Sequence, residues 1–209
     1  MKKTMKKILL LLLALTISTS CLASCAVAPT TEFNSLAELQ EAVKDSPDII
    51  LPDISAYKFE EGSMFWVDYR TSKKKTPAMY SIHGLAENDD SVLAGLGLEC
   101  RILNYYAETG TVFEDLDLNA EYFGIQMYER IVDQTEDPDF LQDKALEKGT
   151  LFYSIYYSFD LKECRYQIGG ALIIPAGEVS SINIDEEIEK SKQELLQIVK
   201  QIIEKGKLI

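Results

Sequence analysis

Residues 150–160, TLFYSIYYSFD, decide the expected fold of this 209-residue chain, because their side chains alternate with the period-two pattern of a β-strand. One face would carry Leu151, Tyr153, Ile155, Tyr157 and Phe159. The opposite face would carry Phe152, Ser154, Tyr156 and Ser158. A turn at residues 160–163 leads into residues 164–177, CRYQIGGALIIPAG, so the two segments predict an antiparallel pair of strands.

Helical patterns lie on both sides of the strand-rich middle of the chain. Residues 34–47, NSLAELQEAVKDSP, predict a short helix that starts with a capping box of Ser35 and Glu38. Residues 183–206 predict a long helix with acidic residues in its first turn, lysines in its last turn and Gly206 as its C-terminal cap. The apolar stripe of this helix, which is expected to lie on a sheet, consists of Ile188, Leu195, Leu196, Val199, Ile202 and Ile203.

Further strands are expected at residues 57–70, 78–85, 98–108, 111–118 and 120–132. The first of these contains Gly62, so it is either two strand arms or one bulged strand. Residues 98–108 and 111–118 are expected to form a hairpin that turns at Gly110. A helix, a run of strands and a final helix predict an α+β fold, an antiparallel sheet with the short N-terminal helix and the long C-terminal helix packed on one face.

The beginning of the chain has the order of a secretory signal peptide: lysines, an apolar run over residues 8–17, and then small residues. A run of about ten residues is too short to span a bilayer, which takes about 20. The run is followed by Leu22-Ala23-Ser24-Cys25, which resembles the lipobox of bacterial lipoproteins. The resemblance implies that residues 1–24 are removed and that diacylglycerol is attached to Cys25, on the extracytoplasmic side of a bacterial cell membrane.

Two alternatives to this assignment are left open by the leader. Cys21 is a second candidate for lipidation, but it is preceded by Ser18 at the position where a lipobox has a leucine-like side chain. An ordinary signal peptide cut after a small residue such as Ala28 would instead release a free secreted protein. Because two acyl chains hold a protein stably, the lipobox predicts a stable anchor.

The amino-acid composition limits the kinds of partner that the protein can bind. Removing residues 1–24 leaves 185 residues, enough for one domain, with 17 basic and 34 acidic residues and a formal net charge of −17. Residues 25–34 are expected to form a tether and residues 35–209 a single α+β domain. Nucleic acid is an unsuitable partner for so acidic a surface, and an anionic membrane would repel it. We therefore expect membrane contact through the lipid anchor only.

The mature part also resembles an uncharacterised extracytoplasmic lipoprotein domain of Gram-positive bacteria. The resemblance rests on residues 35–54, SLAELQEAVKDSPDIILPDI, together with the aromatic strand and the closing helix. It implies a non-catalytic binding or sensing domain and offers no catalytic residue. Our first hypothesis is that such a domain binds a protein or peptide of the cell envelope.

Catalytic and metal-binding patterns are sparse. His83 is the only histidine, and Ser81 lies on the same face of its predicted strand, so an extracytoplasmic hydrolase using His83 or paired carboxylates is the alternative function. The zinc-ligand spacing of a structural site is missing from the sequence. The acidic loop with Asp133, Glu136, Asp137, Asp139 and Asp143 lacks the ligand order of an EF-hand. No cofactor or metal is therefore expected.

Four tyrosines are candidates for a binding face, and two cysteines are candidates for a disulfide. Tyr128, Tyr153, Tyr157 and Tyr166 fall on predicted strands and are the expected binding face, since tyrosine gives a large amphipathic contact area. The alternative is that strands simply favour half-buried tyrosines. In an oxidising compartment Cys100 and Cys164 would form either one disulfide or two buried free thiols.

Overall fold

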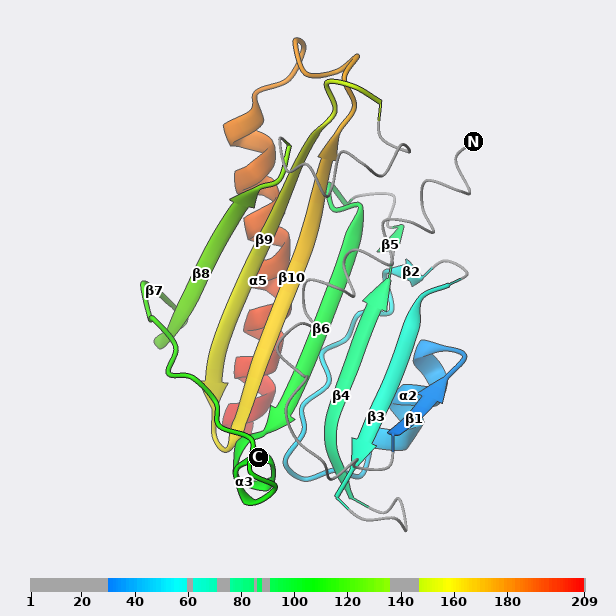
Figure 1. Ribbon diagram of the computed structural model, residues 1–209, viewed down its shortest axis with the longest axis vertical. Coiled ribbons are helices and arrows are strands. Elements are labelled where there is room, and N and C mark those ends of the chain that lie inside the picture. The colour runs from blue at the N-terminus through cyan, green and yellow to red at the C-terminus, as the bar shows by residue number, and fades with distance from the viewer. Residues whose placement is uncertain are drawn as a thin grey trace.

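The protein is built around one antiparallel sheet of eight strands, and the long helix α5 (Ile184–Leu208) crosses one face of it behind β9 and β10 (Figure 1). The computed structural model describes residues 30–59, 62–70, 76–84, 86–87, 91–135 and 147–208. In pairing order the strands are β1 (Thr30–Phe33), β3 (Met64–Tyr69), β4 (Pro77–Gly84), β6 (Gly95–Ile102), β10 (Cys164–Ile174), β9 (Leu151–Leu161), β8 (Ile125–Asp133) and β7 (Ala120–Tyr122). The α+β fold expected from the sequence is confirmed.

Both terminal helices form where the sequence predicts them. The short helix α2 (Leu36–Val43) begins after Ser35, whose hydroxyl accepts a hydrogen bond from the Glu38 amide at 3.3 Å, and α2 packs on β3 and β4. On α5 the predicted stripe is buried from Leu195 to Ile203. Gly206 does not cap α5, as the sequence suggested, but lies inside the helix and is buried. A Cβ atom at this position would come within 2.7 Å of Leu161, so glycine lets the helix approach the sheet closely.

The aromatic hairpin also forms as predicted. Strands β9 and β10 pair along their whole length, from Leu151 opposite Ile174 to Leu161 opposite Cys164. Residues 120–132 form a hairpin rather than one strand, because Phe123 and Gly124 both have positive φ and turn the chain between β7 and β8. The two-residue strand β2 (Lys58–Phe59) pairs with β5 (Ala86–Glu87) rather than with β3.

The hairpin predicted for residues 98–118 is wrong. Strand β6 ends at Ile102, residues Leu103–Glu108 form the helix α3, and residues 111–119 form no strand. The alternating apolar residues of 111–118 imitate a strand, but this segment is held by a side chain of β10 instead of a neighbouring backbone, as described below. Residues 30–33, which the sequence assigned to the tether, pair with β3 as the edge strand β1.

The core lies between the sheet and its helices, and three hydrogen bonds fix residues 48–50 over one end of it. The Tyr166 hydroxyl accepts from the Ile50 amide and the Tyr80 hydroxyl donates to the Ile50 carbonyl, both at 3.1 Å. The Cys164 thiol donates to the Asp48 carbonyl, also at 3.1 Å. Tyr80 and Tyr166 are fully buried, so these hydroxyls satisfy backbone groups that water cannot reach.

Cys100 and Cys164 are buried free thiols on the core face. They are diagonal neighbours, since Cys100 lies opposite Tyr166 while Cys164 lies opposite Ile102. Burial raises the pKa of Cys100, whereas the hydrogen bond between the two thiols lowers the pKa of Cys164. A diagonal pair is farther apart than directly opposed residues, and a disulfide between the two stays a prediction of the sequence.

We expect Tyr166→Phe to lower the free energy of unfolding by about 1–3 kcal/mol, because the buried Ile50 amide loses its acceptor. Tyr105→Phe is the matched control, since no described residue bonds to the Tyr105 hydroxyl, and it should change stability by less than about 0.5 kcal/mol. Urea unfolding of both variants measures the difference. Equal stabilities would contradict the assigned role of Tyr166.

Candidate functional site

The sheet has a second face, turned away from α5, and we call it the outer face. Seven strands each contribute one residue of a continuous row across this face, because the residues are directly opposed in successive strand pairs. From β1 to β8 this transverse row consists of Glu32, Trp66, Ser81, Glu99, Gln167, Ser158 and Tyr128. Neighbours of the row on the same strands, such as Leu98 and Ile168, belong to the buried core on the other face.

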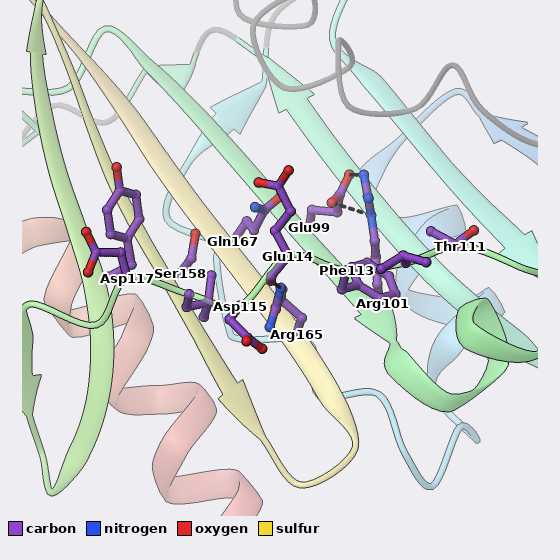
Figure 2. Close-up of a pocket in the computed structure, with 13 residues that line it drawn as sticks. Glu99, Arg101, Thr111, Phe113, Glu114, Asp115, Asp117, Ser158, Arg165 and Gln167 are labelled. Atoms are coloured by element: carbon purple, nitrogen blue, oxygen red, sulfur yellow. Dashed lines mark hydrogen bonds and ion pairs between the residues drawn. The ribbon is translucent and has the colours of Figure 1, made fainter.

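A groove of about 560 Å³ lies over the β8 end of the transverse row. Its floor is made by side chains of β6, β10, β9 and β8, and its wall is the irregular segment of residues 111–117 (Figure 2). The floor residues are Glu99, Arg101, Gln167, Arg165, Ser158 and Tyr128. This is the segment that sequence reasoning assigned to a strand, and its lack of regular structure leaves its backbone and side chains free to line a site.

Arg165 holds the wall of the groove in place. Its Nη1 donates to the Glu114 carbonyl at 2.7 Å, and its guanidinium lies 5.6 Å from the centre of the Phe113 ring. The same guanidinium makes a bidentate pair with Asp160, at 2.8 and 2.9 Å. The positive charge of Arg165 is thus balanced by Asp160. The same side chain holds the 111–117 segment against the sheet.

The second arginine of the floor, Arg101, is balanced in the same way. Its Nε lies 2.6 Å from Glu99 Oε1, and its Nη2 donates to Glu99 Oε2 at 2.9 Å. The two side chains are only 13% and 5% exposed. Burial raises the pKa of Glu99, while the Arg101 charge opposes that rise. The pair places a fixed but locally neutral dipole in the floor.

Other groups in the groove have no protein partner. Among the described residues, none forms a hydrogen bond with the side chains of Tyr128, Ser158 or Gln167. Ser158 is nevertheless 5% exposed, and Figure 2 shows its hydroxyl at the floor of the groove. The wall adds the exposed carboxylates of Glu114, Asp115 and Asp117, which have no ion-pair partner within the described part of the chain. The groove therefore offers uncharged donors and acceptors on its floor and unbalanced negative charge on its wall.

Ser81 and His83 make the contact that the sequence suggested. The Ser81 hydroxyl lies 2.7 Å from His83 Nε2, and the imidazole stacks on Trp66 with ring centres 5.1 Å apart. Both residues are buried, at 0% and 1% exposure, and no described residue pairs with His83 Nδ1. Burial lowers the pKa of His83 to about 4. An inaccessible serine beside so weak a base, with no acid on the other ring nitrogen, does not have the arrangement of a nucleophile and its base.

The tyrosine face expected from the sequence is wrong for three of its four members. Tyr157 and Tyr166 are fully buried on the core face, and Tyr153 follows the same alternation onto that face. Tyr128 alone lies on the outer face, where it lines the groove. Large aromatic residues were drawn into the core because α5 covers that face. The signal missed was the polar and small residues between them, at Ser158, Gln167 and Glu99.

Several predictions concern residues that the structure does not describe. Cys25 with its lipobox, and residues 136–146 of the acidic loop, lie outside the described residues. Among the described residues, no three of His, Cys, Asp or Glu are grouped as a metal site. Within that same part of the chain, no helix combines the length and apolar character needed to cross a membrane.

We expect the imidazole of His83 to titrate near pH 4, because burial favours its neutral form. His83 is the only histidine, so its NMR signals report this pKa directly. The pKa of His83 in the folded state lies below the usual 6.5, so the free energy of unfolding is highest above about pH 7, where the imidazole is neutral in both states. It should fall by about 3 kcal/mol as the pH drops towards 4, and His83→Gln should remove that dependence. A measured pKa of 6.5 or more would contradict the burial of this residue.

Comparison of the chain with models of known protein families, with curated protein sequences and with solved structures gave no match. Residue roles therefore come from the geometry of the outer face alone. That geometry shows a packed apolar core on one side of the sheet. On the other side it shows a groove whose buried Ser158 hydroxyl has no described partner.

Proposed function

We propose that the protein is a non-catalytic binding domain, lipid-anchored through Cys25 on the extracytoplasmic side of a bacterial membrane, and that its ligand binds in the outer-face groove. The observation that carries this proposal is the polar floor of the groove, where the side chains of Ser158 and Gln167 have no hydrogen-bond partner among the described residues. Ser158 is buried and Gln167 is half-buried, so both side chains have donors and acceptors left for a ligand in the groove.

The charges of the groove restrict the ligand to a polar molecule that carries an amino or guanidino group. The lining contains four carboxylates and two guanidinium groups, and both guanidinium groups are committed to carboxylates or to the backbone. The remaining carboxylates of the wall attract a cation and repel an anion. The net charge of −17 calculated for residues 25–209 adds a long-range field of the same sign, which favours the approach of cationic ligands.

The hydrolase alternative has one observation in its favour, the hydrogen bond between Ser81 and His83. A binding role accounts better for the same pair, because both side chains are buried and the imidazole is a weak base. Glu99, directly opposite Ser81 in the sheet, is committed to Arg101. We therefore propose that the protein binds a ligand and does not catalyse a reaction.

Two sources of an amine can be separated by NMR titration of the ¹⁵N-labelled mature protein. Nα-acetyl-lysine methylamide represents a peptide side chain, and glucosamine represents an amino sugar. The norleucine derivative and N-acetylglucosamine are their uncharged counterparts. We expect saturable shifts of amides in residues 111–117 and around Ser158 and Gln167 with at least one amine, and weaker shifts with its uncharged counterpart. The responding amine identifies the source.

A matched pair of variants tests the role of the wall. Glu114→Gln should weaken binding of the responding amine about fivefold, equivalent to about 1 kcal/mol, because a partly exposed carboxylate is lost. Glu178→Gln changes an exposed carboxylate outside the groove and should leave the affinity unchanged. If neither amine gives saturable shifts at the groove, or if Glu114→Gln and Glu178→Gln behave alike, the proposed ligand class is wrong.

A further inference from the structure

We infer that the β1 edge of the sheet faces the membrane, so that the groove opens about 14–29 Å farther out, on the side of the cell wall. This inference rests on the lipidation of Cys25 proposed above, and it is independent of the amine ligand. Its basis is the point at which the described part of the chain begins. Cys25 and Thr30 are five residues apart, and even a fully extended chain of that length spans no more than about 18 Å.

The first described residue is fixed to the sheet. Thr30 lies opposite Asp68 of β3, and its hydroxyl donates to the Asp68 carboxylate at 2.6 Å. The Tyr106 hydroxyl of α3 donates to the other oxygen of the same carboxylate at 3.0 Å. The start of β1 is therefore tied to two other elements and does not lengthen the tether. Residues 30–33 of the expected tether, residues 25–34, therefore belong to the sheet.

The order of the strands gives the distance between β1 and the groove. Strand β1 is at one edge of the sheet, and β10, β9 and β8 are the fifth, sixth and seventh strands of the pairing order. The floor of the groove also includes β6, the fourth strand. Neighbouring strands are about 4.8 Å apart, so the strands of the groove lie about 14–29 Å from β1. The transverse row thus runs from Glu32, beside the anchor, to Tyr128, far from it.

Charge does not decide between the two edges of the sheet, since Glu32, Glu38 and Glu41 near the β1 edge are exposed carboxylates as well. The short tether at the β1 edge decides the orientation, and the carboxylates of the wall then lie at the far end of the row, away from the bilayer. The consequence for function is that the ligand approaches from the wall side, and lipid headgroups of the same membrane are outside the reach of the groove.

Paramagnetic relaxation in nanodiscs tests this orientation. The mature protein is joined through Cys25 to a maleimide lipid, and Cys100 and Cys164 are buried and should not react. Nanodiscs of phosphatidylcholine and phosphatidylglycerol carry a gadolinium-chelating headgroup. We expect amide signals of residues 30–33 and 68–70 to be broadened severalfold more than those of residues 115–117 and 128–133. Equal broadening, or stronger broadening of the second set, would overturn the inference.

A variant with ten Gly and Ser residues inserted after Pro29 is the matched control, because it keeps the fold and the lipid but lengthens the tether. Its broadening should become weaker and more uniform, whereas an unchanged pattern would show that the tether does not set the orientation. Mass spectrometry of the protein extracted from membranes separately tests the anchor. A mature N-terminus other than a lipidated Cys25 would remove the basis of the inference while leaving the amine titration unaffected.

Discussion

Side chains on a β-strand point alternately to the two faces of the sheet, and in this protein α5 and α2 pack on the core face only. Each central strand therefore carries two different sequences. In β6, Leu96, Leu98, Cys100 and Ile102 enter the core, while Glu99 and Arg101 lie on the outer face. A shift of one residue in pairing would exchange these sets, so the apolar face also fixes the register that aligns the transverse row. The polar groove is thus positioned by the core behind it.

Several features of the outer face do not stabilise the fold and are better explained by ligand binding. Burying the Glu99–Arg101 pair removes two charges from water, and well-packed apolar residues are often at least as stable in such a position. Ser158 is buried without a described partner. Arg165 donates one of its hydrogen bonds to the backbone of an irregular segment. Local conflicts of this kind are expected at binding sites, because the ligand supplies the missing partners.

The sequence predicts the parts of the fold that depend on local periodicity. The alternation of residues 151–159, the capping box at Ser35 and the charge order of 183–206 all define elements that the structure contains. It fails where tertiary contacts decide. Nothing local shows that Phe113 and Glu114 would be held by Arg165, or that Gly206 would pack on Leu161. The site was missed for the same reason: its residues are far apart in sequence and meet only through strand pairing, and tyrosine abundance pointed to the wrong face.

The most direct test of a division between a folding face and a binding face needs no ligand. The double change Ser158→Ala and Gln167→Val replaces the unpaired floor of the groove, and Ile168→Ala removes a core side chain from the next position on β10. Chemical unfolding should show the double variant to be as stable as the natural protein, or more stable by up to about 1 kcal/mol. Ile168→Ala should lose about 2–5 kcal/mol. A loss of 2 kcal/mol or more in the double variant, on the order of the core change, would show that the transverse row serves the fold, and would contradict its assignment as a ligand site.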